Sequence, residues 1–260
     1  MNYETLLVNL DDHVAMVRMN RAESMNALEY RLRADLVDCL QTLSEDDDVR
    51  VVVLIGSGNA FCAGGDLREL RHQMKIDQAR KYVNHVNRVI LAVQNMEKPV
   101  IAAVNGAAMG AGFSIVMACD LIVASETARF SQSFVHVGLI PDSGGTYFTP
   151  RIFGLQRAKE FAFTGKILSS DEMARLGLIN QVVCPEELEN KAIELAHQIA
   201  KAPTLALGLT KRLLNQSWSS NLEEMLDLEA QYQAACMQSE DHMEGIRAFY
   251  EKRKAKFKGK

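Results

Sequence analysis

The chain has 260 residues and 48% hydrophobic content, so it is long enough to bury the core of one large domain. Its 29 basic and 33 acidic residues give a net charge of −4, which argues against a nucleic-acid-binding protein, because that class normally shows a basic excess. Five cysteines without paired spacing argue against a disulfide framework or a metal site and favour free thiols in a reducing compartment, here the cytoplasm.

The first quarter of the chain predicts a hairpin, a helix and a buried strand. An early acid and the lack of a basic segment at the N-terminus argue against a signal peptide. Two apolar runs flank the pair Asp11 and Asp12 and predict a β-hairpin. Leucines recur at helical spacing between residues 32 and 43 and predict a helix. The fully apolar run 51–56 is typical of a strand that is buried on both faces.

The middle of the chain predicts further strands that alternate with helices. A helix is predicted from Leu67 to about Glu97, followed by apolar strands at 100–104 and 121–125. The stretch 99–119 has no charge and is long enough to span a membrane. Its many alanines and glycines keep its hydrophobicity modest, so we expect a buried strand and a buried helix instead. Strands that alternate with helices predict an α/β fold with parallel pairing.

One acidic residue stands out in the next segment. Residues 137–140 predict a short strand that stops at Pro141 and leads into a Ser-Gly-Gly turn through Asp142. Asp142 is the only charged residue between Arg129 and Arg151. A carboxylate in a glycine-rich turn can approach a bound ligand closely, so Asp142 is a candidate functional residue.

Amphipathic helices dominate the chain after Gly154. We therefore divide the chain into a core at 1–200 and a helical C-terminal region at 201–260. That region can pack on its own core or on a neighbouring subunit. Six basic residues crowd the C-terminus from Lys252 to Lys260, and this tail is either simply solvated or contacts a phosphate.

Two glycine-rich loops follow neighbouring buried strands. Residues 61–67 follow the strand at 51–55, and residues 105–114 follow the strand at 100–104. Backbone N–H groups are unpaired where a strand leads into a helix, and they suit an anionic oxygen. The alternative is that the glycines only permit tight packing. Neither loop has the third glycine of a dinucleotide fingerprint, and no phosphate-loop motif is present.

Motifs along nearly the whole chain resemble the crotonase, or enoyl-CoA hydratase/isomerase, superfamily. They include AFCAGGDL at 60–67, NGAAMGAGFSIVMACD at 105–120, the segment 130–154 and TGKILSSDEMARLGLINQVV at 164–183. The resemblance implies an α/β spiral of ββα units with a helical C-terminal region, assembled as a homotrimer or a dimer of trimers. It also implies an acyl-CoA thioester as the substrate, with no metal and no cofactor beyond the coenzyme A of the substrate.

The same resemblance implies which residues form the site. The N–H groups of Gly65 and Ala111 match the family's oxyanion hole, which stabilises a thioester enolate. Asp66 is among the residues that match the acyl-CoA path, although an aspartate there can equally cap a helix that starts at Leu67. The residues expected along the acyl-CoA path are Ser24, Met25, Ala27, Ala63, Asp66, Leu67, Phe134, Phe249 and Lys252.

The sequence departs from the hydratases of this family at both of their catalytic glutamates. Ser114 and Phe134 stand at those two positions, and neither can activate water as a carboxylate does. The remaining acid, Asp142, suits an isomerase, which removes a proton from one carbon and returns it to another. Partial burial against Ile140 and Phe134 would raise its pKa into a useful range. The alternative role of Asp142 is to cap a helix that starts near Ser143.

Two other functions stay open, and a third is disfavoured. One is an enoyl-CoA hydratase that activates water with Asp142 alone, although a wall of Phe113, Phe134 and Leu139 would disfavour water. Another is a non-catalytic acyl-CoA-binding subunit that has kept only the binding site. Aromatic-thioester dehalogenases use an aspartate at the position of Asp142, but they carry a tryptophan where Phe134 stands, so halide displacement is disfavoured.

Overall fold

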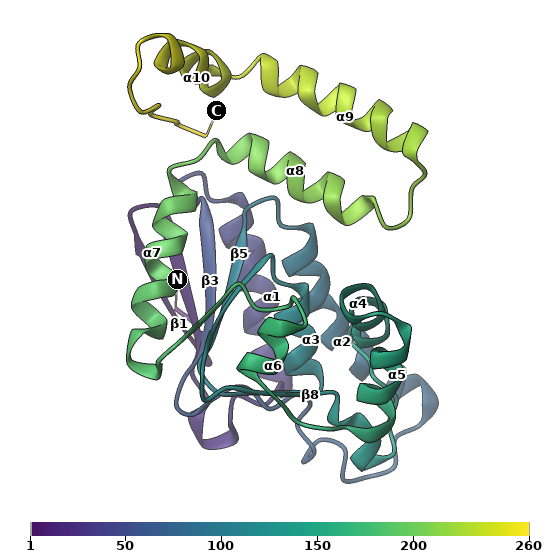
Figure 1. Cartoon of the computed structure of the whole chain (residues 1–260). Coiled ribbons are helices and arrows are strands. Elements are labelled where there is room, and N and C mark those ends of the chain that lie inside the picture. Colours follow the sequence, from purple (N-terminus) through teal and green to yellow (C-terminus); the bar gives the residue numbers. More distant parts are fainter. Residues whose placement is uncertain (1, 260) are drawn as a thin grey trace.

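The computed structural model describes residues 2–259 and contains two sheets surrounded by helices (Figure 1). The larger sheet has six strands in the order β1-β2-β3-β5-β7-β10. These strands are β1 (Leu6–Asp11), β2 (Val14–Met19), β3 (Val51–Gly56), β5 (Val100–Val104), β7 (Leu121–Ser125) and β10 (Gln181–Val183). β1 and β2 form the predicted antiparallel hairpin, and every other neighbouring pair is parallel. The α/β fold class is therefore confirmed.

The smaller sheet has four strands in the order β4-β6-β8-β9. They are β4 (Ala60–Cys62), β6 (Ala107–Met109), β8 (Arg129–Ser131) and β9 (Leu168–Ser169). Strands of two or three residues are too short to show an alternating pattern, so the sequence does not predict them. In chain order, β3 is followed by β4 and α2 (Ile76–Asn95), and β5 is followed by β6 and α3 (Ala111–Ala118). Each repeat places one strand in each sheet, which is the expected spiral of ββα units.

The core lies on both faces of the larger sheet. In β3, Val52 and Leu54 face one apolar cluster, whereas Val51, Val53 and Ile55 face the other. Helices α1 (Tyr30–Glu45), α2 and α3 cover the first face, and α7 (Leu188–Ala200) covers the second. The remaining helices are α4 (Gly145–Phe153), α5 (Leu155–Thr164), α6 (Ser170–Arg175), α8 (Thr204–Gln216), α9 (Leu222–Met237) and α10 (Glu240–Tyr250), with 3₁₀ turns η1 (Ala22–Ser24), η2 (Ser133–Val137) and η3 (Pro185–Glu187).

The prediction of a strand at residues 137–140 is wrong. The chain forms η2 up to Val137, and Gly138 then reverses it with a φ of 70°. Leu139 and Ile140 are exposed, and Pro141 has no N–H group to donate to a strand. The apolar run therefore forms a surface turn, which delivers Asp142 to the start of α4.

The prediction of a continuous helix from Leu67 is also wrong, because α2 starts at Ile76. The Asp66 carboxylate accepts hydrogen bonds from the backbone N–H and the guanidinium of Arg68. A side chain that bonds to the backbone two residues further on favours a turn over a helix. The alternative in which Asp66 caps a helix is therefore wrong as well.

The uncharged stretch 99–119 contains β5, β6 and α3, so the prediction of a buried strand and a buried helix is confirmed. Within residues 2–259, no helix combines the length and the apolar character that crossing a bilayer requires.

Helices α8, α9 and α10 form an arm, and α9 lies on the outer side of α8, away from the sheets (Figure 1). α8 packs on the core, where the Lys211 ammonium group donates to the Asp120 carboxylate over 2.7 Å, and the tail after α10 also returns to the core. The Arg50 guanidinium donates to the carbonyl groups of Ala200, Phe257 and Lys258. The arm exposes many large apolar side chains. They are Leu214, Trp218, Leu222, Leu226, Met237, Met243, Ile246, Phe249 and Tyr250.

Candidate active site

The two glycine-rich loops meet because β4 and β6 pair in parallel. Gly64 has a φ of +88°, and a Cβ atom on it would lie 2.6 Å from the Met109 carbonyl oxygen and 3.3 Å from the Ala111 nitrogen. A Cβ atom on Gly112 would collide with the Cys62 carbonyl oxygen. Only glycine permits such close backbone approach. These contacts place Gly65, the residue after Gly64, beside Ala111.

Gly65 and Ala111 each present a free backbone N–H group. Within residues 2–259, neither group donates a hydrogen bond, although the neighbouring Gly64 and Gly110 N–H groups bond to Cys62 Sγ and to the Ser131 carbonyl. Ala111 is the first residue of α3, where the helix dipole adds positive potential. Two adjacent free donors suit an oxygen atom that carries negative charge.

A third loop, at residues 24–28, is hydrogen-bonded to the glycine-rich loop that contains Gly65. Ala63 N–H donates to the Met25 carbonyl over 3.0 Å, and Leu28 N–H donates to the Gly64 carbonyl over 2.8 Å. Asn26 is fully buried, and its amide group bonds to the Ala60 carbonyl. The predicted residues Ser24, Met25, Ala27 and Ala63 therefore lie on two loops that are bonded together next to Gly65. Asp66 is buried and paired with Arg68, and Leu67 is exposed to solvent.

Asp142 lies against the first turn of α3. The Ser114 hydroxyl donates to the Asp142 carbonyl over 3.2 Å, so the serine at the position of a hydratase glutamate holds the backbone of the candidate acid. Phe134 is buried, and its ring tip lies 3.6 Å from where a Cβ atom on Gly110 would be. Asp142, Phe134 and Ala111 thus lie around one end of α3.

The Asp142 carboxylate does not cap α4. That helix starts at Gly145, and Asp142 contributes its carbonyl oxygen, which accepts the Gly145 N–H over 2.7 Å. The capping interpretation is therefore wrong. Burial raises the pKa of Asp142 above its ordinary value, while hydrogen bonds from the Ser143 hydroxyl and from its own N–H oppose the rise. The expected contact with Ile140 does not cause the burial, since Ile140 is 78% exposed.

The predicted apolar wall is only partly present. Phe134 lies by the site, but Phe113 packs in the core against Phe130, with ring centroids 5.6 Å apart, and it is 1% exposed. Leu139 is 48% exposed on the turn before Asp142. Phe113 points away from the site because it is on the face of α3 that covers the sheet.

The structure adds Tyr82 and Arg33, which the sequence analysis missed. The Tyr82 hydroxyl lies 3.1 Å from where a Cβ atom on Gly65 would be. The Arg33 guanidinium carbon lies 4.4 Å from the centroid of the Tyr82 ring, and its Nη2 donates to Glu69 over 3.0 Å. Tyr82 continues the apolar stripe of α2 formed by Val86, Val89 and Val93, and this helical spacing is the signal that could have indicated an inward-facing tyrosine.

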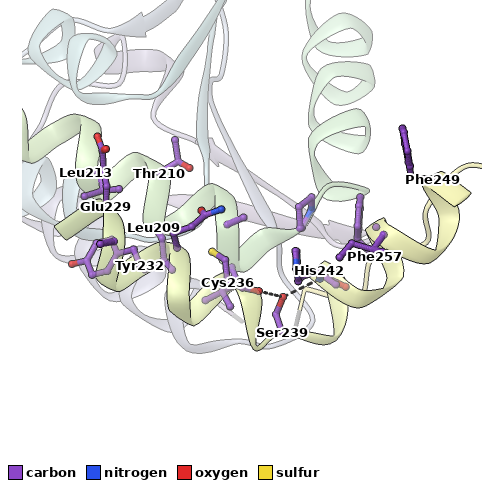
Figure 2. Close-up of a pocket in the computed structure, with 18 of the residues that line it drawn as sticks. Leu209, Thr210, Leu213, Glu229, Tyr232, Cys236, Ser239, His242, Phe249 and Phe257 are labelled. Atoms are coloured by element: carbon purple, nitrogen blue, oxygen red, sulfur yellow. Dashed lines mark hydrogen bonds between the residues drawn. The ribbon is translucent and has the colours of Figure 1, made fainter. Parts of the chain in front are cut away.

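Phe249 and Lys252 lie elsewhere in the chain. Phe249 is on α10, is 80% exposed and borders a groove of about 970 Å³ between the helices of the arm (Figure 2). Lys252 follows α10. Within one chain, α10 lies at the upper left of Figure 1, whereas α4 lies at the right, below the other end of the arm. The structure therefore does not bring these two predicted residues to Gly65, Ala111 and Asp142 of the same chain.

Comparisons with known proteins agree with the geometry. Residues 9–260 match the family model of enoyl-CoA hydratase/isomerase. The 1,2-epoxyphenylacetyl-CoA isomerase of Escherichia coli K12 is 36% identical over 99% of both chains, and the crotonyl-CoA hydratase of Syntrophomonas wolfei is 34% identical over 99% of both. A crystal structure of an enoyl-CoA hydratase from Bacillus anthracis, 36% identical, superposes with a TM-score of 0.94 over 99% of this chain and 100% of that one. The chain therefore belongs to the enoyl-CoA hydratase/isomerase family, a part of the crotonase superfamily.

Proposed function

We propose that this protein isomerises the double bond of an enoyl-CoA through a thioester enolate, with Asp142 as the acid and base. The observation that carries the proposal is a half-buried carboxylate beside two free N–H groups, with Ser114 and Phe134 at the family's glutamate positions. The N–H groups of Gly65 and Ala111 bind the thioester oxygen, and no further cofactor is required.

The reaction balances with one carboxylate. For a 3-enoyl-CoA, the Asp142 carboxylate takes a proton from C2, and the electron pair delocalises over C2, C4 and the thioester oxygen. The two N–H groups stabilise the charge on that oxygen. The protonated Asp142 then returns its proton to C4, which yields the 2-enoyl-CoA and restores the carboxylate. The raised pKa of Asp142 makes its carboxylate a stronger base, which favours the removal of the proton from C2.

A second candidate is hydration of a 2-enoyl-CoA with Asp142 as the base. It is kept because a relative that is 36% identical is named as an isomerase and one that is 34% identical is named as a hydratase. Isomerisation and hydration both use the N–H groups of Gly65 and Ala111, so the presence of these groups does not distinguish the two reactions.

Product analysis in deuterated water separates the two candidates. We expect a 3-enoyl-CoA to give the 2-enoyl-CoA, with deuterium at C4 when Asp142 exchanges its proton before returning it. We expect a 2-enoyl-CoA to give little 3-hydroxyacyl-CoA. Mass spectrometry and NMR of the products provide the readout. Full-rate hydration of the 2-enoyl-CoA without any isomerisation of the 3-enoyl-CoA would contradict the proposal.

We further propose that the chain assembles as a trimer or a dimer of trimers, in which the arm of one subunit contributes Phe249 and Lys252 to the acyl-CoA site of another. The exposed apolar side chains of the arm support this proposal, since large exposed apolar patches mark interaction surfaces. The distance between α10 and α4 within one chain is a second support.

Light scattering tests the assembly. We expect a molar mass of three or six times 28.9 kDa for the full chain. Replacing Leu222 and Leu226, which are 74% and 54% exposed, by glutamate should lower the molar mass while circular dichroism stays unchanged. A wild-type chain that stays monomeric at assay concentration would contradict the proposal.

A further inference from the structure

Tyr82 brings a hydroxyl group to the Gly65 side of the site. It belongs to α2, and its oxygen lies 3.1 Å from the point where a Cβ atom on Gly65 would be. Gly65 has no positive φ, so its backbone does not itself require glycine. The space that a side chain at position 65 would need is limited by the Tyr82 hydroxyl alone. The Tyr82 hydroxyl therefore faces the side of Gly65 on which a side chain would lie.

The hydroxyl is buried and has no hydrogen-bond partner within residues 2–259. A buried polar group without a partner is costly, and native proteins nearly always satisfy such groups. Phenylalanine would fill the same volume without this cost. A ligand that accepts a hydrogen bond from this hydroxyl would explain why a tyrosine, and not a phenylalanine, stands near the free N–H group of Gly65.

The surroundings of the ring fix its position and keep the hydroxyl protonated. Arg33 is 3% exposed, and its guanidinium lies over the ring face, 4.4 Å from the ring centroid, while Nη2 is paired with Glu69. Burial raises the pKa of Tyr82, and the Arg33 charge partly offsets the rise. The charges of Glu69 and Asp142 raise the pKa of Tyr82 further. Tyr82 is thus a neutral donor at neutral pH.

We propose that the Tyr82 hydroxyl is a third hydrogen-bond donor to the thioester oxygen, beside the N–H groups of Gly65 and Ala111. The inference deepens the proposed function and rests on its enolate chemistry. Arg33 acts as a positioning residue, because it touches the tyrosine ring and not the substrate. The electron-rich oxygen of an enolate accepts stronger hydrogen bonds than the neutral carbonyl of the thioester, so the third donor favours the enolate over the ground state.

The test uses Tyr82→Phe, which removes one oxygen atom, and acetoacetyl-CoA, whose enolate absorbs in the near ultraviolet. Titration of the bound probe reports the apparent pKa of its enolate without any turnover. We expect Tyr82→Phe to raise that pKa by about one to two units and to lower kcat by about 10- to 100-fold, as for the loss of a hydrogen bond to a charged group. We expect KM to change much less. Tyr3→Phe is the matched control, since its hydroxyl bonds to Asp38 over 2.9 Å outside the site.

A second variant tests the contact itself. Gly65→Ala places a methyl group 3.1 Å from the Tyr82 oxygen and should displace it. Its loss of kcat should therefore be smaller in the Tyr82→Phe background than in the wild type, whereas two independent sites would give additive losses.

The outcomes separate this inference from the proposed function. An enolate pKa and a kcat that are unchanged in Tyr82→Phe overturn the inference, even when Asp142→Asn still abolishes isomerisation. A raised enolate pKa in a protein that catalyses no isomerisation supports the inference and overturns the isomerase proposal. A lower melting temperature with an unchanged enolate pKa would identify Tyr82 as a packing residue and also overturn the inference.

Discussion

Asp142→Asn is expected to lower kcat for isomerisation by about 10²–10⁴-fold, the range typical of a lost general acid–base. The amide has nearly the same shape, and its oxygen can still accept the Ser143 hydroxyl, which is 2.9 Å from Oδ1 in the wild type. It cannot take a proton from C2 at any pH used in an assay. Steady-state rates with a 3-enoyl-CoA provide the measurement, and acetoacetyl-CoA affinity should change little.

The same variant should fold at least as stably as the wild type at pH 7. Burial raises the folded-state pKa of Asp142 above 3.8, so the folded state binds this proton more tightly than the unfolded state does. The resulting stabilisation is present below pH 3.8 and is lost as the pH rises through the folded-state pKa. At pH 7 the ionised carboxylate therefore lowers stability, and asparagine removes that cost. The difference in melting temperature should shrink toward pH 3.

Controls separate chemistry from binding in this experiment. Asp47→Asn, on the exposed turn after α1, removes a carboxylate away from the site and should leave the rate unchanged. In the wild type, log kcat/KM should fall with decreasing pH at a pKa above the ordinary aspartate value, because the carboxylate must be ionised to act as the base. Isomerisation by Asp142→Asn at the wild-type rate would favour a different catalytic acid. No turnover in either protein would favour a non-catalytic acyl-CoA-binding protein.

The sequence was sufficient for the parts of the fold that local patterns determine. The run at 51–56 predicts a strand buried on both faces, and the structure shows two apolar clusters, one on each face of β3. Long amphipathic segments such as α7 likewise follow from their spacing. The strands β4 and β6 could not be predicted, because three residues carry no periodicity. Their pairing is nevertheless what brings Gly65 next to Ala111.

The site was predictable only where a motif fixes the backbone. The roles expected for Gly65 and Ala111 are those that the resemblance implies, and the close approach of Gly64 to Ala111 provides a physical reason for the glycines. The prediction of a strand before Asp142 is wrong, because propensity does not reveal that a positive φ at Gly138 reverses the chain. Tyr82 was missed because its contact with Gly65 joins a helix to a loop 17 positions away in sequence, and no local pattern encodes such a contact.

The proposed role of the Gly65 and Ala111 N–H groups in binding the enolate oxygen is best tested at Ala111. A substitution there can remove the N–H donor without disturbing the helix. Ala111 is the first residue of α3, the helix position at which proline is best tolerated. Ala111→Pro should therefore keep the fold and lower kcat for isomerisation by at least about 10²–10³-fold, the typical loss for one oxyanion donor. It should also raise the apparent pKa of bound acetoacetyl-CoA enolate.

Leu155→Pro is the matched control, since Leu155 is the first residue of α5, is 54% exposed and belongs neither to the arm nor to the site. Both variants place proline at the same helix position, so a general effect of proline on stability would appear in both melting curves. Only Ala111→Pro should impair the stabilisation of the enolate, and the loss should persist at saturating substrate. An Ala111→Pro variant that folds and isomerises at the wild-type rate would show that this N–H group does not bind the enolate oxygen, and the donors would then have to be sought elsewhere in the chain.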